Sequence, residues 1–302
     1  KIERSTTLKE LNKDEDDLAE APKEEEDEDD HTFIKLKSIN FAPVAGSKRM
    51  HSLVMTKNND YDFCHMNLDA HLVTLVIELF RAEKKLSKSS VVKILRRSYK
   101  SILNQKNVTY MKVDNVSKIT VVGDLHGQLA DLLYIFDECG LPNENNKFIF
   151  NGDFVDRGAN GFEVVFLILL MYVVFGPSVI SLNRGNHEDA SVCRVYGFEE
   201  EVLVKYDELM FEMFAELFNN LPLFSVINNS IFVVHGGLFH EPKVTLDELE
   251  RIPRTDYFVK PAIPYPENLH GLSEEDCYRE YLKQLQRDAL WSDPIAENGC
   301  YL

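Results

Sequence analysis

Cysteine is scarce in this chain of 302 residues, and the five cysteines are scattered. Cys64, Cys139, Cys193, Cys277 and Cys300 form no CxxC pair and have no spacing typical of a disulfide framework. An odd and sparse set of this kind is typical of a reducing compartment, where disulfides are rare. We therefore expect a cytoplasmic protein, with the nucleus as a second location.

The chain also lacks a long hydrophobic run. The longest apolar stretch, residues 164–175, ends at Gly176 and Pro177, whereas a helix needs about 20 apolar residues to cross a bilayer. No positively charged segment followed by an apolar one opens the chain, so no signal peptide is predicted. We expect no membrane span and interpret residues 164–175 as a buried helix.

Basic residues are outnumbered by acidic ones, 33 to 50, which gives a formal net charge of −17. Residues 1–31 alone contain fourteen acidic and five basic side chains. This stretch has too few apolar groups to offset the entropy lost on folding, so we predict an acidic disordered tail, with a docking segment as the alternative. The acidic balance argues against nucleic acid as a partner, because that binding needs Lys and Arg to neutralise phosphates.

Hydrophobic periodicity predicts an α/β domain from residue 67 onward. Residues 32–66 form an N-terminal extension with little pattern beyond one strand near 33–36, and residues 252–270, with four prolines, indicate a surface loop. Strands are expected at 119–122, 148–150 and 179–182, and as a hairpin at 225–227 and 231–234. Helices are expected from 67, from Ser87 or Ser89, and at 129–138, 162–175, about 199–219 and 274–289.

Four of the expected strands are followed directly by side chains that can bind a metal. These are Asp124 with His126, then Asp153, Asn186 and His235. In open α/β sheets ligands gather at the carboxyl ends of strands, where the loops converge. Carboxylate, imidazole and amide groups without thiolate suit Mn, Fe or Zn at a catalytic site. Asp153, in the middle of the series, is the candidate bridge between two ions about 3.5–4 Å apart.

These blocks resemble, in order, the signatures of the phosphoprotein phosphatase family. They are Gly-Asp-Leu-His-Gly at 123–127, Gly-Asp-Phe-Val-Asp-Arg-Gly at 152–158, Gly-Asn-His-Glu at 185–188 and His-Gly-Gly at 235–237. The resemblance covers about residues 67–302 and includes Tyr-Gly-Phe at 196–198 and Trp-Ser-Asp-Pro at 291–294. Within that family, the residues before the second and third blocks, Phe150-Asn151 and Asn183-Arg184, look most like those of the EF-hand-containing phosphatases. The tetratricopeptide-bearing phosphatase is the next most similar.

The resemblance implies a calcineurin-like metallophosphoesterase fold, in which helices flank a central β-sandwich that carries a β-α-β-α-β metal-binding motif at 119–186. It also implies a role for each site residue. The first metal would be held by Asp124, His126 and Asp153, the second by Asp153, Asn186 and His235, and phosphate by Arg157 and Asn186, while His187, oriented by Asp156, would protonate the leaving oxygen.

The implied activity is that of a metal-dependent serine/threonine protein phosphatase, which hydrolyses phosphoserine and phosphothreonine by in-line attack of a metal-bridging water. Two divalent or trivalent ions are implied, Mn in vitro and Fe or Zn as alternatives. Implied partners are phosphoprotein substrates and a regulatory subunit or calcium-sensing segment outside this chain. The alternatives are a metallophosphoesterase acting on nucleotides and a non-catalytic or dominant-interfering fragment.

The family pattern continues past the Trp-Ser-Asp-Pro block with a second phosphate-binding arginine and a further histidine ligand. Because the chain ends at Leu302, we expect the catalytic domain at 67–302 to be incomplete at its C-terminus. We further expect weak metal affinity, little turnover and an exposed sheet edge.

Several polar side chains near these blocks have a plainer interpretation. In that interpretation Asp156 is merely a partner for Arg157, and His187 merely packs against its neighbours. For the others we expect a hydrogen-bond acceptor beside the ligands (Glu188), a packed thiol (Cys193), ordinary surface residues (His240 and His270) and a core residue (Trp291).

Overall fold

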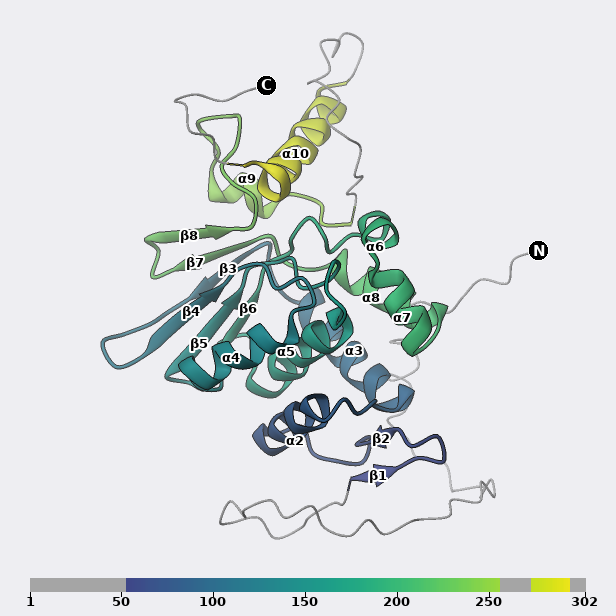
Figure 1. Ribbon diagram of the computed structural model, residues 1–302. Helices are drawn as coiled ribbons and strands as arrows, with labels where there is room; N and C mark the ends of the chain where they lie inside the picture. The colour runs from purple at the N-terminus through teal and green to yellow at the C-terminus, as the bar shows by residue number, and fades with distance from the viewer. Residues whose placement is uncertain (1–52, 256–272, 294–302) are drawn as a thin grey trace, which may run out of the picture.

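The computed structural model describes residues 53–255 and 273–293 (Figure 1). Five predictions lie wholly or largely outside these residues: the acidic tail, the strand near 33–36, most of the loop at 252–270, His270 and the segment after residue 293. No helix within the described ranges is long and apolar enough to cross a membrane.

Eight strands and nine helices make up the described part of the chain. The strands are β1 (Val54–Met55), β2 (Tyr61–Asp62), β3 (Val108–Met111), β4 (Lys118–Val122), β5 (Asn146–Phe150), β6 (Ile180–Leu182), β7 (Phe224–Ile227) and β8 (Ile231–Val234). The helices are α2 (Ala70–Arg81), α3 (Lys88–Leu103), α4 (Leu129–Cys139), α5 (Gly161–Phe175), α6 (Ala190–Tyr196), α7 (Phe198–Lys205), α8 (Glu208–Phe218), α9 (Leu246–Glu250) and α10 (Glu274–Trp291).

The predicted metal-binding motif forms a parallel sheet with the order β4-β5-β6. Helices α4 and α5 connect its strands, which confirms the β-α-β-α-β arrangement. A second sheet has the order β3-β7-β8. In it β3 runs parallel to β7, while β7 and β8 form the predicted hairpin around Asn228 and Asn229.

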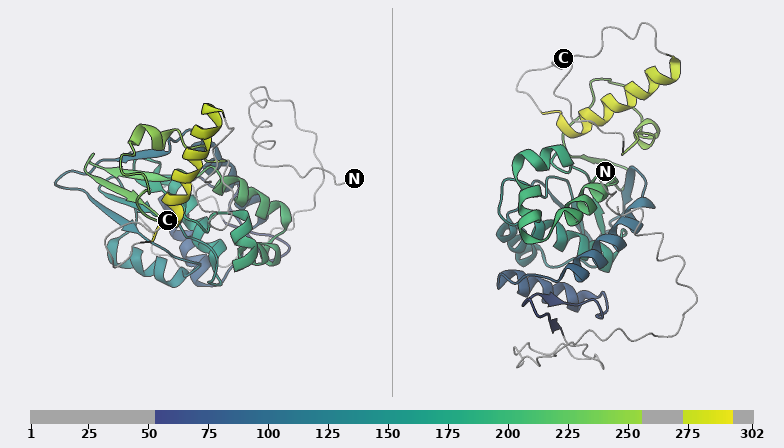
Figure 2. Two further views of the ribbon diagram at one scale, coloured as in Figure 1. Left: turned by 90° about the horizontal axis from the view of Figure 1, so that it is seen from above. Right: turned by 90° about the vertical axis from the view of Figure 1, so that its right-hand side faces the viewer.

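The two sheets pack face to face, and helices cover both outer faces. On β5, Phe148 and Phe150 point into the helical core, whereas Ile149 points between the sheets, as the alternation of side chains along a strand requires. On β7, Phe224 packs beneath α9 and α10 while Ile227 faces the other sheet. Figures 1 and 2 show the resulting layers, with α9 and α10 at one end of the molecule and α2 at the other. The predicted β-sandwich flanked by helices is confirmed.

Side-chain caps fix where α2 and α3 start. Asp69 accepts a hydrogen bond from the Leu72 amide at the start of α2, and Ser87 accepts one from Ser90 at the start of α3. Such caps pair amide groups that have no partner inside the helix. The choice of Ser87 over Ser89 as the N-cap is thereby settled.

The region expected to be helical at about 199–219 is helical, but it consists of two helices, α7 and α8, with a break at Tyr206 and Asp207. The Asp207 side chain accepts a hydrogen bond from the Met210 amide and so starts a new helix. Sequence patterns also missed β1, β2, β3, α6 and α9. Phe63, next to β2, is 1% exposed within the core formed by the helices. The packed core therefore includes residues on the N-terminal side of residue 67.

Candidate metal centre

The predicted ligands converge because the strands before them end at the same edge of the sandwich. Val122 is in register with Phe150, and Phe150 with Leu182. The loops after β4, β5 and β6 therefore begin side by side. The loop after β8 reaches the same edge from the other sheet, because His235 donates from Nδ1 to the Asn151 carbonyl, 2.8 Å away.

Backbone strain is concentrated in these loops. Eight described non-glycine residues have a positive φ, and four of them are site residues: His126, Asp153, Asp156 and Arg157, with φ values of 40°, 53°, 69° and 64°. Left-handed backbone is unfavourable for residues with a Cβ, and such positions cluster at functional sites. The loop conformations thus support the interpretation of these side chains as a site.

Two glycines allow the loops after β5 and β6 to approach each other. A Cβ on Gly185 would lie 2.3 Å from Asp153 Oδ1 and 2.4 Å from the Asp153 amide nitrogen. A Cβ on Gly152, which has φ +88°, would lie 2.5 Å from Gly185 Cα. Only a residue without a side chain fits at either position.

Asp153 lies at the middle of the cluster and is 3% exposed. Its Oδ2 is 3.4 Å from His126 Nε2, and its Oδ1 is 3.4 Å from His235 Nε2. Two triads share it, and the ligand atoms within each triad lie within 4.8 Å of one another. One triad adds His126 and His187, and the other adds Asp124 and His235. The position of Asp153 between two groups of ligands fits a bridging carboxylate.

Backbone carbonyls fix which ring nitrogen of each histidine faces the centre. His126 Nδ1 donates to the Val155 carbonyl at 2.9 Å, as His235 Nδ1 does to Asn151. A neutral ring held in this way presents a lone pair at Nε2, and in both rings Nε2 faces Asp153. Hydrogen bonding from the other ring nitrogen to a carbonyl is the usual arrangement of metal-binding histidines.

The amide of Asn186 completes the test of whether a cation fits. With its nitrogen inward, it lies 2.8 Å from His235 Nε2 and 3.1 and 3.2 Å from the two oxygens of Asp153. With its oxygen inward, as a metal ligand requires, the amide oxygen faces His235 Nε2 and the Asp153 carboxylate. All of these atoms are then hydrogen-bond acceptors. A cation is the group that fits among a carboxylate, an amide oxygen and an imidazole lone pair.

Asp124 lies on the exposed side of the cluster. Its side chain is 59% exposed, and its Oδ1 lies 3.9 Å from His235 Nδ1. Among the described residues, the triads group Asp124 with His235 rather than with His126. The grouping of Asp124 with His126 around a first ion stays a prediction.

Glu188 is the buried acceptor that was expected beside the ligands. Its carboxylate accepts hydrogen bonds from the amides of Asp153 (2.7 Å), Phe154 (2.8 Å) and Gly185 (2.9 Å). Burial, followed by the nearby charge of Asp153, raises the pKa of Glu188 to about 7. This side chain holds the two ligand-bearing loops together.

His187 and Asp156 form a hydrogen-bonded pair beside the cluster. His187 Nδ1 donates to Asp156 Oδ2 at 2.7 Å, and Asp156 Oδ1 accepts from the Phe198 amide at 3.0 Å. Burial lowers the pKa of His187, but the hydrogen bond to Asp156 and the charge of Asp153 outweigh burial and leave the pKa raised. The second ring nitrogen, Nε2, lies 3.3 Å from Arg157 Nη2.

The packing of Cys193 beside this pair was predicted, whereas the contact of Tyr196 with the pair was missed. Cys193 is a packed thiol as expected, since it is buried and donates from Sγ to the His187 carbonyl. Tyr196 packs edge-on against the His187 ring, with centroids 5.0 Å apart, and its carbonyl accepts a hydrogen bond from the Arg157 amide. The Tyr-Gly-Phe block was the sequence signal for this contact.

His240 is not an ordinary surface residue, so that expectation is wrong. Its Nδ1 lies 2.5 Å from Asp288 Oδ2 on α10, and its amide donates to the same oxygen at 3.1 Å. Trp291, expected in the core, is 45% exposed.

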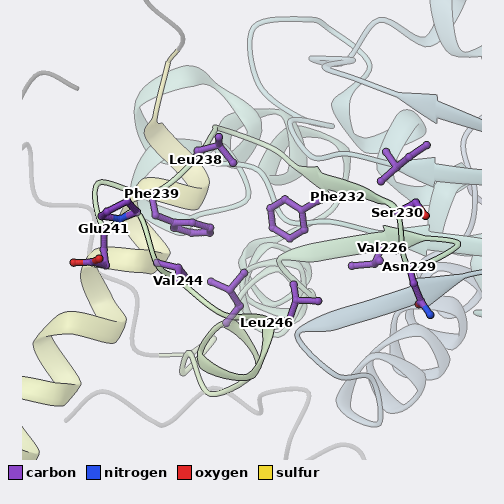
Figure 3. Close-up of a pocket in the computed structure, with 12 residues that line it drawn as sticks. Val226, Asn229, Ser230, Phe232, Leu238, Phe239, Glu241, Val244 and Leu246 are labelled. Carbon is purple, nitrogen blue, oxygen red and sulfur yellow. The ribbon is translucent and has the colours of Figure 1, made fainter. Parts of the chain in front are cut away.

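An apolar pocket of about 380 Å³ lies beside β8 (Figure 3). Phe232, Leu238, Phe239 and Leu246 line it, with Glu241 at its edge. It contains none of the predicted site residues, so the position of the metal centre rests on the convergence of the strand ends.

Comparison with known proteins gives a family match over this region. Residues 117–298 match the family described as calcineurin-like phosphoesterase. Serine/threonine-protein phosphatase T of Trypanosoma brucei brucei is 42% identical over 217 residues, which are 72% of this chain and 41% of that protein. Rat serine/threonine-protein phosphatase with EF-hands 1 is 36% identical over 242 residues, 76% of this chain and 38% of that protein. The chain thus spans less than half the length of these two relatives.

A solved structure supports the same fold. The Saccharomyces cerevisiae protein serine/threonine phosphatase with similarity to human phosphatase PP5 superposes with a TM-score of 0.64 at 33% identity. The match covers 76% of this chain and 66% of that one.

Proposed function

Since this chain belongs to the calcineurin-like phosphoesterase family, we propose that it is a metal-dependent serine/threonine protein phosphatase. The observation that carries the proposal is the position of Asp153, which is buried between two groups of candidate ligands, with Nε2 of His126 on one side and Nε2 of His235 on the other. The similarity to named serine/threonine-protein phosphatases supports the choice of phosphoprotein as substrate.

Eight residues of the cluster take roles in this proposal, and five of them would hold metal. One ion would be held by His126, Asp153 and Asp124, and the other by Asp153, Asn186 and His235, with Mn expected in vitro and Fe or Zn as alternatives. When bound, the ions would supply positive charge to the phosphoryl oxygens and activate water for in-line attack.

Arg157 would bind the phosphate. Its side chain is exposed next to the buried His187, so it can reach a substrate oxygen. An arginine fork makes two parallel hydrogen bonds to a phosphate and stabilises the charge that develops during phosphoryl transfer. The Asn186 amide would help to orient the same oxygens.

His187 would act as the general acid. When the phosphorus–oxygen bond to serine or threonine breaks, the leaving oxygen needs a proton, and Nε2, the ring nitrogen that Asp156 does not hold, would give it. Asp156 holds Nδ1–H, so the proton at Nε2 is the one transferred. Asp156 also stabilises the imidazolium form before the transfer.

We place the protein in the cytoplasm or nucleus as part of the same proposal. All four cysteines in the described ranges carry free thiols, and Cys193 is buried. Regulation by a calcium-sensing segment or a separate subunit is proposed on the likeness to the EF-hand relative.

Substrate comparison tests the proposal. With Mn²⁺ supplied, the chain is expected to release phosphate from a phosphoserine peptide faster than from nucleotide monophosphates or a phosphodiester. His187→Asn should reduce that rate by about 10²–10⁴-fold. Faster turnover of the nucleotides would favour the other phosphoesterase activity. Binding of the peptide without turnover, unchanged in Asp124→Asn, would favour a non-catalytic fragment.

A further inference from the structure

Two asparagine side chains join strands from different sheets immediately behind the metal centre. Asn151 follows β5, and Asn183 follows β6. Asn183 Nδ2 donates to Asn151 Oδ1 at 2.8 Å and lies 3.3 Å from the carbonyl of Val233. Asn151 Nδ2 donates to the carbonyl of Val234 at 3.0 Å. The last two residues of β8 are therefore tied to the sheet that carries Asp153.

Buried hydroxyl groups fix the direction of these bonds. Ser225 donates to Asn183 Oδ1 at 2.7 Å, which forces the Asn183 nitrogen towards Asn151. Ser225 in turn lies 2.9 Å from both Ser181 and Thr109, whose hydroxyls are 2.7 Å apart. Asn183 and Ser225 are fully buried, so the Asn183 amide cannot turn without leaving a polar group unpaired, which is unfavourable away from water.

The network ends at a predicted metal ligand. The residue after Val234 is His235, and its Nδ1 donates to the main-chain carbonyl of Asn151. Asn151 therefore contacts the end of β8 twice, through its side chain and its carbonyl. His126 does not depend on these amides, because it follows β4 and is held by Val155.

We propose that Asn151 and Asn183 are positioning residues that set the orientation of His235, a role that rests on the function proposed above. The amide pair fixes the end of β8 relative to Asp153, so that His235 Nε2 faces the shared carboxylate. Loss of the pair weakens the half of the centre that contains His235 and leaves the half that contains His126.

The ring of His235 can be observed directly without any metal. In protein labelled with ¹⁵N-histidine and kept free of metal, we expect one Nδ1–H tautomer of His235 with slow hydrogen exchange. Asn183→Leu should give a mixture of tautomers and at least about tenfold faster exchange at His235. The His126 signals should stay unchanged. Ser181→Ala is the matched control, since it removes a buried hydroxyl of the same cluster that does not touch either amide.

Metal titration provides the second readout. Outer partners of metal-binding histidines typically contribute about 10–100-fold to metal affinity. In Asn183→Leu we expect a loss of that size for one Mn²⁺ site only, with Ser181→Ala matching the wild type. If Asn183→Leu does not fold, the double variant Asn151→Leu/Asn183→Leu serves instead. That double variant leaves neither amide unpaired, and its His235 signals should change in the same way.

Three results would overturn the inference. They are an unchanged His235 tautomer in the folded variants, an equal change at His126 and His235, and a change of the same size in Ser181→Ala. If the wild type binds no Mn²⁺, the proposed function fails, while the tautomer measurement still decides the role of the amides.

Discussion

At the residue scale, the pairing of His187 with Asp156 predicts a pH effect. The general acid works in its protonated form, so activity falls as the pH rises through its pKa. Asp156 raises the pKa of His187, and Asp156→Asn removes that contribution. We expect the alkaline limb of the kcat profile to move to lower pH, with a decrease in kcat of up to about 10²–10⁴-fold. Wild type and variant are compared at saturating Mn²⁺, and an unmoved limb would mean that Asp156 does not act through His187.

A second prediction at this scale concerns the glycine between β6 and Asn186. Gly185→Ala would force Asp153 to move, because the added methyl group overlaps both its side chain and its backbone. We expect Mn²⁺ affinity to fall by about tenfold or more, as measured by calorimetric titration. Gly123→Ala is the control, since a Cβ there meets nothing within 4 Å. Equal affinities in the two variants would rule out the close approach of the loops.

At the element scale, α5 obtains its N-terminal cap from another helix. Asn160 makes no side-chain cap, and Glu201 on α7 accepts hydrogen bonds from the amides of Gly161 (3.1 Å) and Phe162 (2.9 Å). Removing the acceptor leaves these amides without their partner in the core helix. We expect Glu201→Ala to lower the free energy of unfolding by about 1–3 kcal/mol. Urea denaturation measures this, with Glu200→Ala, a variant of an exposed neighbour, as the control. Equal unfolding midpoints in the two variants would contradict the role of Glu201 as a cap.

The elements that could be predicted are those with a clear signal in their own local sequence. Strands β4, β5 and β6 are short and apolar and run directly into a glycine or polar ligand, so both the strands and the site residues after them were found. Strand β3 was missed because its position depends on pairing with β7, far along the chain. The break between α7 and α8 depends on the Asp207 cap, which the apolar pattern on both sides concealed.

Contacts between distant polar side chains were also beyond the reach of the sequence. The link between His240 and Asp288 joins a loop to α10, and neither residue carries a local signal for the other. In the sequence, Asn151 and Asn183 indicated only a resemblance to the EF-hand-containing phosphatases, and no contact between them was predicted. Their hydrogen bond follows from the register of β5 with β6 and from the packing of the two sheets.

At the scale of the whole molecule, the sandwich joins loops from two sheets around one carboxylate. The parallel sheet supplies Asp124, His126, Asp153 and Asn186, and the antiparallel hairpin supplies His235. Neither sheet alone contains both groups of ligands. The packing between the sheets is therefore part of the metal centre as well as of the core.

The most direct test of this account is anomalous X-ray diffraction at the manganese edge from crystals supplied with Mn²⁺. The account predicts two peaks about 3.5–4 Å apart, both in contact with Asp153, with His126 beside one and His235 beside the other. In Asp153→Asn both peaks should weaken. A single peak, or a pair of peaks that does not share Asp153, would contradict the account.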